Sequence, residues 1–245
     1  MLLRLPSIRS ASETVQFADV SLNSELETIR ALNDAAGAQN RIHEILLMID
    51  LGDLREGIFF EDRDRILHVA GETLKMKNIR LLGIGTNLSC YGGIIPTEQN
   101  LGVLCDIADM LEKELDCKLQ VISGGNSTSI YLAYEDRMPE RINNLRIGGR
   151  YYHGCPKEET RQMEQAYDDA ITLNVEVIEV YDKPSVPIGE FGTDAFRRRP
   201  VFEDRGIITR AVLAIGQQDI DSANLVPTDP DIVIPNKPLS TIEWE

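Results

Sequence analysis

Short apolar runs alternate with amphipathic segments along the first 150 residues of the chain. The runs HEILLMI and IRLLGI are almost continuously apolar, which is typical of strands buried on both faces of a parallel sheet. Between such runs, apolar residues recur at helical spacing. Alternating strands and helices with short links predict right-handed βαβ units. We predict strands at 1–5, 18–23, 43–52, 79–86, 118–123 and 143–148, and helices over 24–36, 61–76 and 97–115.

Two of the predicted helices carry recognisable start signals. Ser24 and Glu27 stand at the spacing of a capping box, in which each side chain bonds the backbone N–H of the other residue. Thr97 precedes the longest amphipathic segment and is a candidate N-cap. These positions are predicted to fix where the first and the last of the three helices begin.

After about residue 168 the pattern changes from helical to alternating. Residues 169–180, DAITLNVEVIEV, alternate polar and apolar side chains, as in a half-exposed antiparallel strand. The proline-rich tail, 226–245, has no evident partner strands. We therefore predict two domains, a β/α domain over 1–168 and a mostly β domain over 169–245.

The predicted fold class is α/β, with a (β/α)8 TIM-like barrel that is incomplete in this chain. About six βα units are visible, whereas eight strands are needed to close such a barrel. We expect six parallel strands flanked by helices, with an open gap between the strand at 143–148 and the strand at 1–5. A partial, mostly β C-terminal domain would follow.

Composition argues against several classes of partner. The net charge of −15 disfavours nucleic acid, whose phosphates require a basic surface, and no basic amphipathic run suggests an anionic membrane. No apolar stretch reaches transmembrane length, and the N-terminal apolar segment is too short for a secretory signal. The four cysteines show neither a CxxC pair nor a metal-binding spacing. We therefore expect a cytoplasmic protein with free thiols and no metal site.

The carboxyl ends of the predicted strands are rich in glycine and polar residues, and the chemistry of parallel β/α proteins collects there. The clearest case is SGGNSTS, residues 123–129. Two interpretations are open: a tight turn with a helix N-cap, or a cradle whose backbone N–H groups bind a phosphate. The chain has no Walker A lysine, and GIGTNL at 83–88 lacks the third glycine of a dinucleotide fingerprint. A phosphorylated ligand of another kind is therefore favoured.

Other polar residues at these strand ends also allow more than one interpretation. Arg55 and Arg146 can bind an anion or donate to a ring nitrogen, and Arg146 can equally form a structural ion pair. Asp50 and Asp53 are interpreted as a helix start and a solvated charge. Cys90 is interpreted as a small buried residue rather than a nucleophile, because no partner histidine lies near it in the sequence.

Six motifs occur in a specific order along the chain: MIDLGDLREGI, GIGTNLSCYGG, ISGGNSTS, NNLRIGG, KPSVPIGEFGTDAF and PVFEDRGI. In combination they resemble the ornithine racemase branch of the alanine racemase family, and the likeness extends to about residue 234. The resemblance implies a barrel that binds pyridoxal 5'-phosphate, followed by a β domain. It implies an enzyme that interconverts L- and D-amino acids by moving the α-proton. It also implies a small amino-acid substrate, ornithine or alanine, and a homodimer of the complete protein.

By position, the resemblance assigns roles at the phosphate and at the ring nitrogen of the cofactor. Asn126 and Ser127 would hold the phosphate, together with the backbone of Gly148 and Gly149. Arg146 would face the pyridine nitrogen. Its permanent positive charge would discourage protonation of that nitrogen and so limit transamination.

Two further residues are assigned near the ring. Asn87 would lie against it, where alanine racemases place a histidine. Arg55 would lie near the phenolic oxygen of the cofactor or the carboxylate of the substrate. Thr193 falls where alanine racemases have a catalytic tyrosine, so the resemblance names no second acid/base in this chain.

The family also uses a lysine, at the end of its first barrel strand, that binds the cofactor covalently. Such a segment would precede Met1, and none of the seven lysines of the chain ends a first strand. Three interpretations remain: a truncated racemase, a non-catalytic protein that binds pyridoxal phosphate, or a structural subunit that completes its barrel with another chain. The truncated racemase is favoured, because an open barrel exposes two apolar strand edges. The chain alone is then expected to lack racemase activity.

Overall fold

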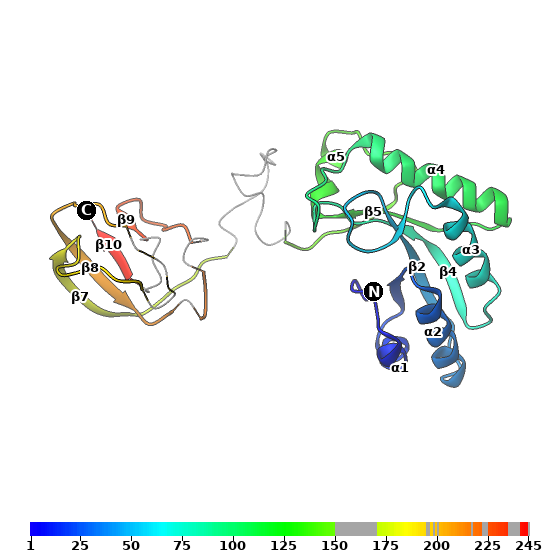
Figure 1. Ribbon diagram of the computed structural model, residues 1–245, viewed down its shortest axis with the longest axis horizontal. Coiled ribbons are helices and arrows are strands. Elements are labelled where there is room, and N and C mark those ends of the chain that lie inside the picture. Colours follow the sequence, from blue (N-terminus) through cyan, green and yellow to red (C-terminus); the bar gives the residue numbers. More distant parts are fainter. Residues whose placement is uncertain are drawn as a thin grey trace. The chain divides into compact units, whose positions relative to one another are not determined.

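The computed structural model describes residues 1–149, 171–194, 201–216, 218–221, 225–234 and 241–244, together with Arg197 and Arg199. The chain divides into two compact units, Met1–Ile171 and Thr172–Glu245 (Figure 1). Each unit has its own β-sheet.

The first unit contains a parallel sheet covered by helices (Figure 1). Its strand order is β1-β2-β4-β5-β6, and β3 pairs with the carboxyl end of β2. The strands are β1 (Val20–Asn23), β2 (His43–Asp50), β3 (Ile58–Phe59), β4 (Ile79–Gly85), β5 (Val121–Asn126) and β6 (Asn144–Arg146). The helices are α1 (Ala11–Phe17), α2 (Leu26–Ala38), α3 (Arg63–Leu74), α4 (Glu98–Leu115) and α5 (Ile130–Tyr134), with short 3-10 turns η1 (Ile8–Ser10) and η2 (Ser127–Ser129). No helix in the described ranges combines the length and the apolar character needed to cross a membrane.

The predicted open, parallel sheet is confirmed. Five of the predicted strands are present, and the sixth parallel strand is the two-residue β3, which the sequence pattern does not indicate. The segment 1–5 contributes a single bridge, in which Leu2 pairs in parallel with Ser21. Within the described residues, β6 and β1 stand at opposite ends of the strand order, so the sheet is a partial barrel.

Helix starts were only partly predictable from capping residues. The Thr97 side chain accepts a hydrogen bond from the Asn100 backbone N–H at 3.1 Å, and the Asn100 side chain accepts one from the Thr97 backbone N–H, so the predicted cap of α4 is confirmed. The predicted capping box of Ser24 and Glu27 is wrong, because α2 begins after Glu25, whose side chain makes no cap bond. Helix α1 is not predicted, since a seven-residue segment is too short to show a clear helical period.

The two faces of β2 pack into different apolar clusters. Ile45, Leu47 and Ile49 are fully buried in the main core, which also contains the apolar faces of α2, α3 and α4. Leu46 and Met48 belong to a second, smaller cluster. Burial on both faces is what the near-continuous apolar run HEILLMI predicts.

Strands β4 and β5 approach each other so closely at Gly83 that only glycine fits there. A Cβ atom at position 83 would lie far inside van der Waals contact of the Val121 carbonyl oxygen. Gly83 pairs with Val121, directly after a register shift in the pairing of β2 with β4. This approach fixes the spacing of two strands whose carboxyl ends carry the loops predicted to bind a ligand.

The second unit contains a four-stranded antiparallel sheet in the order β7-β8-β10-β9. Its strands are β7 (Val177–Pro184), β8 (Ile207–Leu213), β9 (Ile232–Val233) and β10 (Thr241–Trp244). The mostly β character is confirmed for the described residues. The expectation that the tail has no partner strands is wrong, because β10 pairs with both β8 and β9. These tail strands have four and two residues, too few for the alternating pattern that identifies a strand.

Gly83→Ala should destabilise the first unit, because the added methyl group forces β4 away from β5. We expect the free energy of unfolding to fall by about 3 kcal/mol. The matched control is Gly102→Ala in α4, where a Cβ meets no atom within 4 Å and alanine should stabilise the helix by about 1 kcal/mol. Urea unfolding followed by far-ultraviolet circular dichroism measures both variants, since every α-helix of the described chain lies in the first unit. Equal stabilities for the two variants would contradict the close approach.

Candidate functional site

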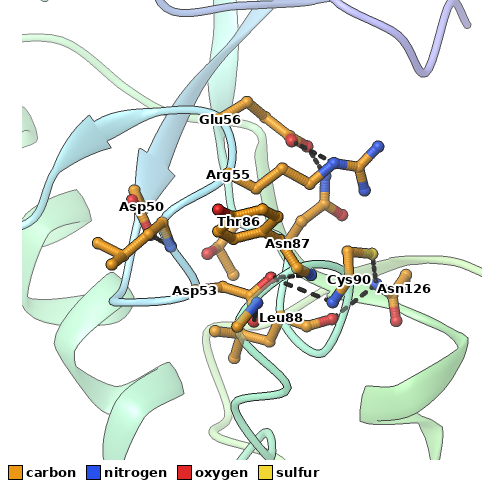
Figure 2. Close-up of polar contacts among 12 residues, drawn as sticks. Asp50, Asp53, Arg55, Glu56, Thr86, Asn87, Leu88, Cys90 and Asn126 are labelled. Atoms are coloured by element: carbon orange, nitrogen blue, oxygen red, sulfur yellow. Dashed lines mark hydrogen bonds and ion pairs between the residues drawn. The ribbon is translucent and has the colours of Figure 1, made fainter.

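The loops that follow β2 and β4 meet the end of β5 at the carboxyl edge of the parallel sheet. Figure 2 shows Asp53 and Glu56 from the first loop pointing toward Asn87 and Cys90 of the second, with Asn126 beside Cys90. The carboxyl ends of parallel strands share one edge, and the polar segments singled out in the sequence therefore lie close together.

Asp53 joins the loop after β2 to the loop after β4. Its carboxylate is fully buried and accepts five backbone N–H bonds of 2.9 to 3.2 Å from the segment 89–94. The donors are Ser89, Cys90, Tyr91, Gly92 and Ile94. Burial by itself raises the pKa of the Asp53 carboxyl, but these N–H groups outweigh it and hold the pKa below its usual range. The interpretation of Asp53 as a solvated charge is therefore wrong, and the residue is the buried anchor of a loop.

Asp50 shapes the loop after β2 and does not start a helix. One of its carboxylate oxygens accepts the backbone N–H groups of Gly52 at 2.9 Å and Leu54 at 3.1 Å, a turn that aspartate commonly forms. The loop returns to β2 at Gly57, which has a positive φ and where a Cβ atom would lie 2.5 Å from the Asp50 backbone nitrogen. Residues 51–57 contain no helix, so the helix-start interpretation of Asp50 is wrong.

Arg146, at the end of β6, reaches the neighbouring strand β5 and the residues that follow β4. Its guanidinium donates to the Thr86 carbonyl oxygen at 2.6 Å, to Asn87 Oδ1 at 2.6 Å and to the Ser123 hydroxyl. Burial lowers the pKa of Arg146 to about 10, and the negative charge of Glu56 opposes that effect. Arg146 therefore remains charged at neutral pH. In the described part of the chain its hydrogen-bond partners are neutral oxygens, and the alternative of a structural ion pair is not found there.

Glu56 belongs to this cluster, although the sequence analysis did not identify it. Its carboxylate accepts a hydrogen bond from Asn87 Nδ2, and its second oxygen pairs with Arg55 Nε at 3.0 Å. The Glu56 side chain is 11% exposed, whereas that of Arg55 is 50% exposed. The only signal in the sequence is an acidic residue directly after Arg55, which does not distinguish a buried carboxylate from a solvated one.

The SGGNSTS segment contains the N-cap that one interpretation predicts. Asn126 caps the turn η2 by accepting bonds from the Thr128 backbone N–H at 2.8 Å and the Thr128 hydroxyl at 2.7 Å. Its amide also donates to the Leu88 carbonyl oxygen at 2.9 Å and to the Cys90 sulfur at 3.0 Å, which ties the segment to the loop after β4. Cys90 is exposed, so its interpretation as a buried residue is wrong.

Ser127 lies against the glycine pair that follows β6. Its hydroxyl oxygen accepts the Gly148 N–H at 3.0 Å. Gly148 and Gly149 are both exposed, and a Cβ at either position would meet no described atom within 4 Å. A hydroxyl and a backbone N–H beside open space are the kind of donors that bind phosphate, so the cradle interpretation is compatible with the N-cap.

Two buried side-chain oxygens near the carboxyl ends of the strands have no hydrogen-bond partner among the described residues. They are Asn23 Oδ1, at the end of β1, and Thr86 Oγ1, directly after β4. A buried polar atom without a partner costs roughly 1–3 kcal/mol. A bound polar molecule that reached either oxygen would therefore be stabilising. Within the same residues, no group of three or more histidine, cysteine, aspartate or glutamate side chains could hold a metal ion.

The partial parallel barrel covered by helices defines an α/β protein, with a hydroxyl-rich loop and a glycine pair at the carboxyl edge of its sheet. Residues 1–156 match the family described as alanine racemase, N-terminal domain. The chain is 46% identical to an ornithine racemase of Acetoanaerobium sticklandii and 38% identical to a lysine racemase of Thermotoga maritima, each over 234 residues. The chain belongs to the alanine racemase family, as its motifs indicated.

The chain spans about two thirds of the length of these curated relatives. Each match covers 96% of this chain, but 66% of the ornithine racemase and 64% of the lysine racemase. The fold resembles the alanine racemase of Clostridium difficile 630, with a TM-score of 0.59 at 17% identity over 100% of this chain and 63% of that one. The alanine racemase of Streptomyces lavendulae gives a TM-score of 0.63 at 17% identity, over 96% and 60%. The alanine racemase family uses pyridoxal phosphate.

Asp53→Asn should destabilise the first unit, because the amide loses the charge and turns an N–H group toward the backbone donors. We expect a loss of about 3 kcal/mol near neutral pH. The folded-state pKa of Asp53 is lowered, so its contribution is present above the unfolded pKa and is lost as the pH falls through the folded pKa. The difference between wild type and variant should therefore shrink below about pH 4.

Urea unfolding at a series of pH values, followed by far-ultraviolet circular dichroism, checks this expectation. Glu27→Gln is the control, because Glu27 is 67% exposed and pairs with Arg30 on the surface of α2. Its effect should stay below about 1 kcal/mol. A destabilisation by Asp53→Asn that does not change between neutral and acid pH would show that the charge of Asp53 is not what holds the loop.

Proposed function

We propose that the whole protein containing this chain is a pyridoxal-phosphate-dependent amino-acid racemase, and that the carboxyl edge of the parallel sheet holds its cofactor. The observation that carries the proposal is the 46% and 38% identity to an ornithine racemase and a lysine racemase over 96% of this chain. The names of these relatives support a substrate with a second amino group, and we propose ornithine as the first to test.

The residues at this edge fit the phosphate of the proposed cofactor. A phosphate requires N–H and O–H donors, and the Ser127 hydroxyl, which accepts the Gly148 N–H at 3.0 Å, can still donate its own proton. Gly149 adds a further backbone N–H beside them, and Asn126 holds the turn in which Ser127 lies. We assign the phosphate to these four residues.

The residues between β4 and β6 fit the ring of the cofactor. An unprotonated pyridine nitrogen needs a hydrogen-bond donor, and the Arg146 guanidinium carries several N–H groups. Arg146 also donates to the Thr86 carbonyl oxygen. The Thr86 hydroxyl beside it is buried and has no partner in the described chain. Asn87 would lie against the ring and hold Arg146 from one side. The half-exposed Arg55 would bind the substrate carboxylate or the phenolic oxygen of the cofactor.

When bound, the cofactor supplies an electron sink for the negative charge that develops at the α-carbon of the substrate. Arg146, with a pKa of about 10, would donate a hydrogen bond to the ring nitrogen and keep its own proton. An unprotonated ring nitrogen would withdraw fewer electrons, which would disfavour transamination relative to racemisation. The role of Arg146 is thus to set the outcome of the reaction, and it does not itself move the α-proton.

We also propose a compartment, an assembly and domain limits for the protein. The free cysteines Cys90, Cys105 and Cys117 are compatible with a reducing compartment, and we propose a cytoplasmic location. A homodimer is proposed from the family resemblance. We also propose that the cofactor-binding domain extends to about residue 168 and the β domain from there to residue 245.

The direct test is whether the whole enzyme, expressed from its complete gene, converts L-ornithine or L-lysine into the D form in the presence of pyridoxal phosphate. Chiral chromatography measures the product. We expect ornithine to be racemised faster than alanine. Absence of racemisation with all three amino acids would overturn the proposal.

Ser127→Ala should weaken cofactor binding by about 10-fold, the effect of one lost hydrogen bond to a charged group. Absorbance titration with pyridoxal phosphate measures the dissociation constant. Ser7→Ala is the matched control, because the Ser7 hydroxyl also accepts a backbone N–H, from Ser10, in the exposed turn η1. Equal dissociation constants for the two variants would show that Ser127 does not bind the phosphate of the cofactor.

Arg146→Glu in the whole enzyme should raise transamination relative to racemisation, because a carboxylate at the ring nitrogen favours protonation of that nitrogen. The two products, keto acid and D-amino acid, are quantified from the same reaction. Arg146→Lys keeps the positive charge and should change the ratio less. A ratio equal to that of wild type in Arg146→Glu would contradict the proposed role of Arg146.

A further inference from the structure

Glu56 is connected to both arginines of the site, directly to Arg55 and through Asn87 to Arg146. Its Oε2 is 3.0 Å from Arg55 Nε, and its Oε1 accepts a hydrogen bond from Asn87 Nδ2. Asn87 in turn receives a hydrogen bond from Arg146 Nη2 at 2.6 Å. One largely buried carboxylate therefore contacts Arg55 directly and Arg146 through a single side chain.

The two neighbours of Asn87 determine which way its amide faces. An ionised carboxylate can only accept hydrogen bonds, and a guanidinium can only donate them. The amide nitrogen must therefore face Glu56 and the amide oxygen must face Arg146, as is found. If the amide turned over, it would present N–H groups to Arg146 and an oxygen to Glu56, and both bonds would be lost.

Glu56 also acts on Arg146 through its charge. The Arg146 guanidinium is buried, and burial lowers its pKa, while the negative charge of Glu56 raises it again. Glu56 thus favours the charged form of Arg146 as well as its orientation. In the loop after β2, Arg55 carries the opposite charge, and its Nε pairs with Glu56 at 3.0 Å.

We propose that Glu56 is a positioning residue, which orients Arg146 through Asn87 and orients Arg55 directly. The inference rests on the proposed function, because it gives Glu56 a purpose in a site that binds pyridoxal phosphate and an amino acid. On this proposal the donor at the ring nitrogen and the half-exposed arginine share one carboxylate. A change at Glu56 should therefore alter the orientation of both Arg146 and Arg55, although Glu56 itself need not contact the cofactor.

The first experiment tests the connection without any cofactor. In ¹⁵N-labelled chain, the side-chain N–H resonances of Arg146 are assigned by their loss in Arg146→Lys. Glu56→Gln preserves the shape of the side chain but removes the charge, and it should shift or broaden these resonances. Glu27→Gln, which removes a carboxylate from a surface ion pair with Arg30, should leave them unchanged. Unchanged Arg146 resonances in Glu56→Gln would overturn the proposal.

The second experiment is a double-mutant cycle in the whole enzyme with Glu56→Gln, Asn87→Ala and the combined variant. The dissociation constant of pyridoxal phosphate and the ratio of transamination to racemisation are measured for each. Glu56→Gln alone should weaken cofactor binding by about 10-fold and raise the ratio. In the Asn87→Ala background the same substitution should change the ratio by less than about 2-fold, because the connection is already broken. Independent, additive effects on the product ratio would overturn the proposal.

Further variants separate positioning from a merely structural role. If Glu56 only stabilised the loop, Glu56→Gln would lower the melting temperature and the rate but leave the product ratio unchanged. Glu56→Asp, which keeps the charge, should instead retain much of the wild-type ratio. If Glu56→Gln does not fold, Asn87→Ala is the remaining test. This variant removes the side chain between Glu56 and Arg146, so it must raise the ratio of transamination to racemisation by itself. Wild-type enzyme that neither binds pyridoxal phosphate nor racemises amino acids would overturn the proposed function. A functional wild type with an unaffected Glu56→Gln would overturn only the role of Glu56.

Discussion

Asp53 gathers five backbone N–H groups around one buried carboxylate, and the geometry of the site follows from that arrangement. The segment 89–94 forms no helix or strand that could satisfy these groups, so the Asp53 carboxylate is their acceptor. Arg55 and Glu56 follow Asp53 closely in the chain, and Asn87 lies two residues before the anchored segment. The same anchor therefore fixes the separation between the charged loop and the amide that faces it.

The charges at this edge are few and mutually oriented. Arg146 is held by three acceptors, two from the residues that directly follow β4 and one from β5, so its guanidinium cannot rotate without losing hydrogen bonds. Donors fixed in advance stabilise a developing charge without reorganising during the reaction. In a racemase of the proposed kind, such a fixed donor would hold the ring nitrogen of the cofactor throughout the reaction.

Local patterns predict the layout of the first unit well, because apolar runs, amphipathic segments and the Thr97 cap depend on neighbours in sequence. Asp53 and Glu56 were missed because their burial depends on the loop 86–94, which approaches them only after β2 and β4 have paired. The motif resemblance located Arg146, Ser127 and Gly148, and the structure places the last two in contact. In the second unit, β9 and β10 are too short to be recognised alone and exist by pairing in the sheet that contains β8.

Because Asp53 binds the segment 89–94 through backbone N–H groups, it places no demand on most of the side chains there. Tyr91 is exposed, so its side chain can be exchanged while the loop keeps its path. Two kinds of change are barred: proline at any of the five donors, which has no N–H to give, and any side chain at Gly92, whose Cβ would lie 2.8 Å from the Asp53 carbonyl oxygen. The loop can therefore change many of its side chains at little risk to the fold, because its path is encoded in the backbone.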